Sequence, residues 1–225
     1  MYILYGGDFT RSVLVQWVLE EGDLDYEFRA IDILKGQHKT AAFLAINPAG
    51  LLPVLITPEG QPLFETAALM VYLADRHGLS DLAPPVADPL RGLFLSAIFC
   101  LAGDIQSEMK RFHFPHRFSN RPGDMHLVQD MARSLVLARL GIMNERLGRS
   151  GPYILGTRFS LADAYLSYWV AWLGGGQAVA ELPSIAELYR LVRSRARIGA
   201  CLEETEQMAV AYAEMMKRSP GGVIP

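Results

Sequence analysis

The residues of this sequence best suited to chemistry are Glu65 and Thr66, ten positions after the segment Leu52-Pro53-Val54-Leu55. Pro53 has no N–H for a sheet ladder, so it bends the chain at the entrance to a short strand and leaves the Leu52 backbone free to bond another group. Glu65 and Thr66 open a helix-like segment whose first N–H groups have no partner within the helix. A strand entrance beside a helix beginning predicts a pocket for a small peptide that carries a carboxylate.

The composition is typical of a packed globular protein. The chain has 225 residues, 51% of them hydrophobic and 20% charged, which is enough for one large domain or two small ones. A net charge of −3 argues against a nucleic-acid partner, because such a surface needs clustered basic charge. Cys100 and Cys201 are far apart and have apolar neighbours, which predicts buried free thiols in a reducing compartment. The sequence has no metal-ligand spacing, so we expect no metal.

The sequence shows no targeting or membrane-spanning segment. Residues 1–8 lack a basic region and reach Asp8 too soon for a signal peptide. The longest uncharged stretch, 164–180, is interrupted by three glycines and is too short to cross a bilayer, so it predicts a buried helix. We therefore expect a cytoplasmic protein without a membrane partner.

The first 78 residues alternate strand-like and helix-like segments. The strands are predicted at 2–5, 26–30, 54–57 and 62–64, and the helices at 10–21, 38–46 and 65–77. This βαβαββα order predicts a sheet with a parallel part and an antiparallel edge hairpin.

The second half of the chain is predicted to be helical. Residues 79–89 contain Pro84-Pro85 and Asp88-Pro89, which predict a stiff linker. The helices beyond it are predicted at 90–112, 123–149, 160–173, 183–195 and 198–216. Ser160 and Asp163 form a capping box at one helix start, a structural role without chemistry.

Together these features resemble the cytosolic glutathione transferase family over nearly the whole chain. The run 10–21 is similar to the first helix of bacterial members that use Ser or Thr rather than Cys. The resemblance implies an α+β, thioredoxin-like N-terminal domain at 1–78 that binds glutathione. It also implies an all-helical C-terminal domain at 90–225 that supplies most of the second substrate's pocket, and a homodimer.

The resemblance implies glutathione contacts at the strand entrance and the helix start. It implies a cis Leu52–Pro53 bond, with the Leu52 backbone pairing with the cysteinyl part of glutathione as an added strand would. Glu65 would take the ammonium of the γ-glutamyl end, and Thr66 with the helix N–H groups would take its carboxylate.

The glycyl end of glutathione would lie near His38 and Lys39. Relatives often carry Lys or Gln at the position of Leu51, where that side chain helps hold the glycyl carboxylate. The Leu51 side chain cannot do so, and this weakens the site or shifts the role to His38 or Lys39.

The chemistry implied by the family needs a thiolate at neutral pH, although a free thiol has a pKa of about 8.5. Thr10 and Ser12 are the candidate hydroxyl donors at the start of the first helix. Thr10 also suits a simple helix cap, and Tyr5 is a third candidate whose place on a strand favours packing. Arg11 either binds a substrate carboxylate or lies in solvent, and we favour the second.

Phe112, Phe114 and Phe118 alternate with basic residues, and they predict either the edge of the second-substrate pocket or only a helix end. The leading hypothesis is a detoxifying transferase that joins the glutathione thiolate to a small hydrophobic electrophile. The alternatives are glutathione-dependent peroxide or disulfide reduction, and a non-catalytic binding or scaffold protein with the same fold.

Overall fold

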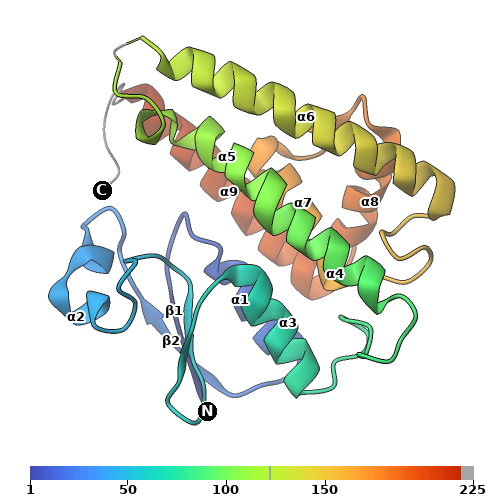
Figure 1. The fold of residues 1–225 in the computed structure, drawn as a ribbon, viewed down its shortest axis with the longest axis horizontal. Coiled ribbons are helices and arrows are strands. Elements are labelled where there is room, and N and C mark those ends of the chain that lie inside the picture. Colours follow the sequence, from blue (N-terminus) through green and yellow to red (C-terminus); the bar gives the residue numbers. More distant parts are fainter. Residues whose placement is uncertain (122, 219–225) are drawn as a thin grey trace. The chain divides into compact units, whose positions relative to one another are not determined.

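The computed structural model describes residues 1–121 and 123–218, which form two compact units. The first unit contains residues 1–83 and the described end of the last helix from Val210 onward, and the second contains residues 84–209 (Figure 1). The first is a small mixed sheet with helices and the second is helical. The predicted fold class, thioredoxin-like followed by all-helical, is confirmed.

The sheet of the first unit has the strand order β2-β1-β3-β4. Its strands are β1 (Tyr2–Gly6), β2 (Tyr26–Ala30), β3 (Val54–Ile56) and β4 (Pro62–Leu63). β1 and β2 are parallel, whereas β3 is antiparallel to both β1 and β4. The predicted parallel part and antiparallel hairpin are confirmed, because parallel neighbours need a crossover and antiparallel neighbours need only a turn.

Three α-helices belong to the first 83 residues, α1 (Ser12–Glu21), α2 (Ala41–Leu44) and α3 (Thr66–Arg76), with a 3-10 turn at Gln37–Lys39. α1 and α3 lie side by side (Figure 1). The helix predicted at 38–46 is divided, because Thr40 has an extended backbone and its hydroxyl caps α2 by accepting the Phe43 N–H.

α1 begins two residues later than predicted. A turn precedes it, in which the Thr10 N–H donates to the Gly7 carbonyl at 3.3 Å. Phe9, inside this turn, has φ of 60°, a left-handed conformation that costs a side chain other than glycine about 1–2 kcal/mol. Arg11 therefore occupies the cap position and makes no side-chain cap bond. Thr10 stands one residue before the cap, and its hydroxyl oxygen accepts the N–H of Ser12, the first residue of α1, at 3.4 Å.

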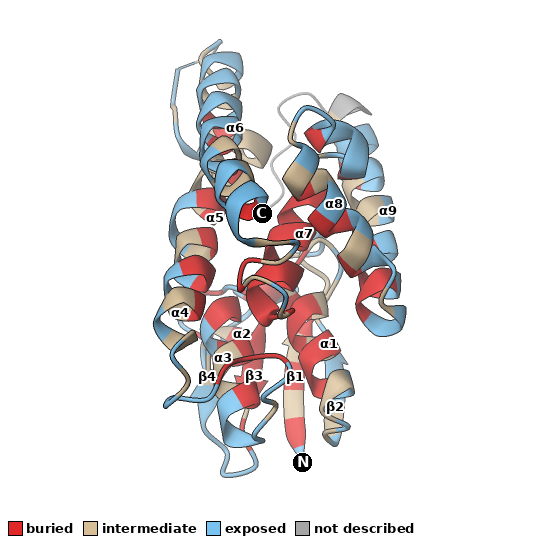
Figure 2. Cartoon of the chain, turned by 90° about the vertical axis from the view of Figure 1, so that its right-hand side faces the viewer, coloured by how far each residue is buried: buried red, intermediate tan, exposed pale blue. Residues whose placement is uncertain are grey.

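The helical unit contains α4 (Arg91–Cys100), α5 (Gln106–His113), α6 (Met125–Ser150), α7 (Leu161–Leu173), α8 (Pro183–Arg193) and most of α9 (Ala196–Arg218). A π-helical turn at Leu101–Ile105 separates α4 from α5, where the sequence predicted one continuous helix. α7 is buried along almost its whole length, whereas α6 exposes much of its surface (Figure 2). α7 is therefore the core of this unit.

The predicted capping box at the start of α7 is confirmed. Asp163 Oδ2 accepts the Ser160 N–H at 2.8 Å and the Ser160 hydroxyl at 2.9 Å. Asp163 Oδ1 also accepts the Ile154 N–H at 2.8 Å, a bond that the sequence did not predict. The fully buried carboxylate thus ties the loop before α7 to the helix itself.

Cys100 and Cys201 form no disulfide within the described residues. Cys201 is buried, as predicted, but the prediction that Cys100 is buried is wrong, because it lies on α4 with part of its surface exposed. Among the described residues, no helix is both long enough and apolar enough to cross a membrane.

Candidate functional site

Two hydroxyl groups lie together just before and at the start of α1. Thr10 Oγ1 is 2.8 Å from Ser12 Oγ, and both side chains are buried. Thr10 Oγ1 also donates to the Gly7 carbonyl at 2.6 Å, and Ser12 Oγ accepts the Gly7 N–H at 3.2 Å. The Ser12 side chain packs so closely on Gly6 that any Cβ at Gly6 would clash with it.

The protons of these hydroxyls have a defined order. A carbonyl only accepts, so Thr10 gives its proton to Gly7, and the proton between the two hydroxyls must come from Ser12. The Gly7 carbonyl also accepts the Thr10 N–H. It therefore still has one donor if the Thr10 hydroxyl proton rotates towards another acceptor. Thr10 can therefore redirect its proton to an incoming anion without leaving a backbone group unpaired, and Ser12 supports it as a donor.

The beginning of α3 carries a second polar group. Glu65 stands just before α3 with φ of 69°, and its carboxylate is exposed and has no ion pair within the described residues. Thr66 is 2% exposed, and its Oγ1 accepts Arg11 Nε at 3.3 Å. A carboxylate at this helix start would meet the helix N–H groups, the Thr66 hydroxyl and the Arg11 guanidinium.

The expectation that Arg11 lies in solvent is wrong. Its side chain is half-buried and joins the start of α1 to the start of α3 through Thr66. No local signal in the sequence indicates this contact, because it depends on how α1 and α3 pack.

The Leu52–Pro53 peptide bond is cis, as the resemblance implied. The Leu52 side chain packs with Phe43 and Val54 in one buried apolar cluster. In the described part of the chain, neither the N–H nor the C=O of Leu52 forms a hydrogen bond. Both groups are therefore available to an extended ligand, in the manner of an added strand.

Lys39 and His38 occupy different environments near this loop. Lys39 Nζ donates to the Gly50 carbonyl at 3.2 Å and is exposed, so its charge lies next to Leu51. His38 is 6% exposed, and its carbonyl backs onto Gly50, where any Cβ would clash. Lys39 is therefore the more accessible of the two to an anionic group.

The three phenylalanines predicted for a second-substrate pocket belong to the helical unit, and each ring packs on a cationic or imidazole side chain. The ring of Phe112 contacts His113, Phe114 lies under the Arg117 guanidinium at 4.4 Å, and Phe118 lies under that of Arg111 at 5.2 Å. Phe118 is 45% exposed.

His113, at the end of α5, packs its ring edge-on against Trp172. Burial lowers the pKa of His113 to about 4, below the unfolded value of about 6.5. The folded state therefore binds fewer protons than the unfolded state between these values. The contribution of neutral His113 to the free energy of unfolding is fully present above pH 6.5. This contribution is lost as the pH falls towards 4, by up to about 3 kcal/mol.

Urea unfolding at about pH 7.5 and about pH 4.5 tests this dependence. His113→Gln should reduce the difference in the free energy of unfolding between the two pH values. His126→Gln, at an exposed position on α6, should show the same difference as the original chain. An unchanged slope in His113→Gln would exclude His113 as its source.

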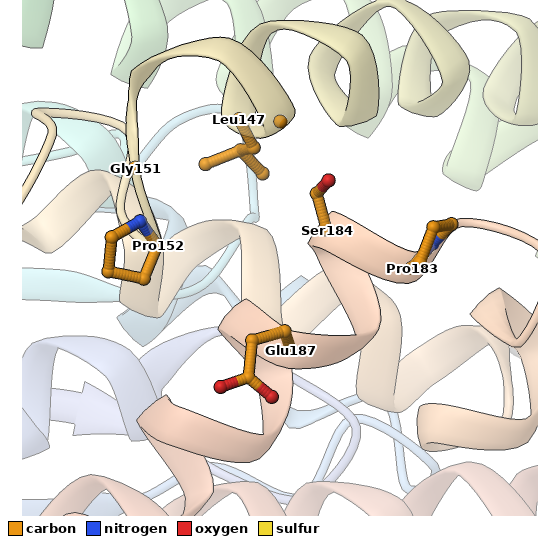
Figure 3. A pocket seen from close by; sticks show the side chains of 7 residues that line it. Leu147, Gly151, Pro152, Pro183, Ser184 and Glu187 are labelled. Atoms are coloured by element: carbon orange, nitrogen blue, oxygen red, sulfur yellow. The ribbon is translucent and has the colours of Figure 1, made fainter.

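An open pocket of about 370 Å³ lies between the end of α6 and the start of α8 (Figure 3). Leu147, Pro152, Pro183 and Glu187 are among its lining residues. None of the predicted site residues lines it. Among residues 1–121 and 123–218, no group of three metal-ligating side chains comes together.

The small mixed sheet and the helical unit define a two-part protein with a thioredoxin-like domain. Family models for the glutathione S-transferase N-terminal and C-terminal domains match residues 12–76 and 126–193. Glutathione S-transferase 3 of Zea mays is 30% identical over 176 residues, which cover 72% of this chain and 73% of the maize protein. The chain belongs to the glutathione transferase family.

Two further relatives cover nearly the whole chain. The disulfide-bond oxidoreductase YfcG of Escherichia coli (strain K12) is 28% identical over 210 residues, 90% of this chain and 94% of YfcG. A crystal structure of a glutathione transferase homolog from sulfitobacter, with bound glutathione, has a TM-score of 0.79 and 28% identity. That match covers 91% of this chain and 98% of the homolog.

Proposed function

We propose that this protein binds glutathione and joins its thiolate to a small hydrophobic electrophile. The observation that carries the proposal is the Thr10–Ser12 hydroxyl pair at the start of α1, where N–H groups and the helix dipole favour an anion. Lowering a thiol pKa by about two units needs roughly 2.7 kcal/mol of preferential thiolate stabilisation. Two hydroxyls and a helix beginning are reasonable sources of that energy.

Thr10 is the proposed direct donor to the sulfur, and Ser12 is its supporting donor. The glutathione thiol loses its proton to solvent, and the thiolate attacks the electrophilic carbon. A carbon–sulfur bond forms as the leaving group departs with its electron pair, or as an activated double bond takes up a proton from water. The protein contributes by stabilising the sulfur anion and orienting the two reactants.

The proposed glutathione contacts follow the geometry of the first unit. Leu52 pairs its backbone with the cysteinyl part, beside the cis peptide bond to Pro53. Glu65 takes the ammonium, and Thr66 takes the γ-glutamyl carboxylate, with Arg11 as an added cation. The glycyl carboxylate lies near His38 and Lys39, with Lys39 as the exposed cation. The sulfitobacter homolog solved with glutathione supports this class of ligand.

For the second substrate we retain Phe112, Phe114 and Phe118 as the proposed apolar contacts. Phe114 and Phe118 each pack on an arginine guanidinium and Phe112 packs on the His113 ring, so an electrophile with an aromatic body suits these rings best. We also retain residues 1–78 and 90–225 as the two functional domains, with 79–89 between them, and a cytoplasmic location.

We further propose a homodimer. α6 exposes Leu127, Met131, Leu135 and Ile142, of which Met131 is 63% exposed. A second copy of the chain would bury such side chains. Sedimentation equilibrium should give twice the 24.9 kDa chain mass, and a single-chain mass would contradict the dimer.

Disulfide reduction is the second candidate, because YfcG matches 90% of this chain. Retention on glutathione resin is the first test, and a chain that fails to bind favours a scaffold role. Parallel assays with an aryl halide, a peroxide and a glutathione-containing disulfide then separate the reactions. Turnover of the aryl halide above the other two supports conjugation, and the reverse order supports reduction.

Glu65→Ala should weaken glutathione binding about 10- to 100-fold, because it removes a charge-assisted hydrogen bond to the ammonium. Turnover at saturating glutathione should change little, since the sulfur lies at α1. Isothermal calorimetry and saturation kinetics measure the two effects. Glu65→Gln keeps a hydrogen-bond acceptor without the charge, so its glutathione affinity should lie between those of the original chain and Glu65→Ala. A loss of turnover with unchanged affinity would contradict the assignment.

A further inference from the structure

The turn that carries Thr10 is held by an aromatic contact from the far end of the chain. Phe9 is the third residue of the Gly7–Thr10 turn, a position where positive φ normally selects glycine or asparagine. Nothing in its own backbone favours φ of 60° for a phenylalanine. An external contact must therefore help to maintain this conformation.

That contact comes from Tyr212 on α9. The two ring centroids are 6.0 Å apart with an interplanar angle of 57°. Phe9 is half-buried and Tyr212 is 4% exposed, and both belong to the first unit. Such tilted aromatic pairs are favourable beyond the apolar area that they bury.

The conformation of the Gly7–Thr10 turn determines the position of the Thr10 hydroxyl. Both the N–H and the hydroxyl of Thr10 donate to the Gly7 carbonyl, at 3.3 and 2.6 Å. These bonds need the chain to reverse between Gly7 and Thr10, which the left-handed Phe9 provides. If Phe9 relaxed to negative φ, the Thr10 oxygen would leave both Gly7 and Ser12.

We infer that Tyr212 is a positioning residue for the reaction, acting through Phe9 to hold the Thr10 hydroxyl where it can donate to the thiolate. This inference rests on the proposed function. It gives the C-terminal part of α9 a role in chemistry although Tyr212 itself contacts no reacting atom. Its effect should fall on thiolate stabilisation and not on glutathione affinity, because Glu65 and Thr66 hold the ligand from α3.

The test compares Tyr212→Ala with Tyr212→Phe, which keeps the ring, and with Val210→Ala at an exposed position on the same helix. Ultraviolet thiolate absorbance is followed against pH with glutathione bound, together with kcat and Kd. Tyr212→Ala should raise the pKa of the bound thiol by about half to one unit and lower kcat by about three- to ten-fold, with Kd within about two-fold. The two control variants should match the original chain.

A rescue variant separates positioning from simple folding support. Glycine adopts positive φ without cost, so Phe9→Gly added to Tyr212→Ala should recover part of the lost kcat. An unchanged thiol pKa in Tyr212→Ala, or no recovery in the double variant, would overturn the inference. If the original chain itself shows no bound thiolate, the proposed function fails instead. Circular dichroism confirms that each variant is folded.

Discussion

Thr10→Val should lower turnover about 100-fold while glutathione affinity changes little. The substitution keeps the size and branching of the side chain but removes the one proton that can be redirected from the Gly7 carbonyl to the sulfur. Loss of a single well-placed donor to a developing anion commonly costs 10²- to 10³-fold in rate. At saturating glutathione, the pH profile of kcat/KM for the electrophile should shift to higher pH, because the bound thiol then ionises less readily.

Ser12→Ala is the matched comparison, with a smaller expected loss. Ser12 donates to Thr10 and accepts the Gly7 N–H, so its removal leaves Thr10 with its own proton. Thr10→Ser retains a hydroxyl and should keep most of the activity. Equal losses in Thr10→Val and Ser12→Ala would contradict the assignment of Thr10 as the direct donor. A full rate in both variants would leave the α1 terminus alone as the source of thiolate stabilisation.

Asp163→Ala should lower the free energy of unfolding by about 3–4 kcal/mol. Asp163 is fully buried and accepts three hydrogen bonds, two from Ser160 and one from the Ile154 N–H. Removing the carboxylate deletes the helix cap and leaves buried donors without an acceptor, and these two losses together account for that magnitude.

Urea unfolding at about pH 8 measures the effect. Burial raises the pKa of Asp163 to about 6, so at that pH the carboxylate is ionised in the folded and unfolded states alike. Asp163→Asn keeps one carbonyl oxygen and should cost less than alanine. Ser160→Ala removes only the hydroxyl and should cost about 1 kcal/mol. A loss below 1 kcal/mol in Asp163→Ala would mean that water replaces the missing acceptor.

The helix-start chemistry also explains why both candidate residues carry hydroxyls. A neutral hydroxyl cannot remove a proton at neutral pH, so neither Thr10 nor Ser12 acts as a base. Each can only stabilise an anion that forms by ionisation to solvent. The protein therefore depends on geometry at α1, and small displacements of the Gly7–Thr10 turn should matter more than the chemical identity of its neighbours.

The sequence by itself determined the features that local interactions control. The order of strands and helices follows from hydrophobic periodicity and from breakers such as Gly22 and Pro48. The Ser160–Asp163 capping box follows from residue spacing within one helical turn. The positions of the Thr10 and Ser12 hydroxyls at the start of an amphipathic helix could also be predicted, whereas their proposed role stays a prediction.

Only the tertiary structure decided how these groups are held. The left-handed Phe9 and its contact with Tyr212 join residues from opposite ends of the chain, and phenylalanine gives no local signal for positive φ. Arg11 reaches Thr66 because α1 packs on α3. The Asp163 carboxylate accepts a hydrogen bond from the Ile154 N–H in the loop before α7. Short-range patterns specify elements, whereas contacts between distant residues depend on packing that no single segment encodes.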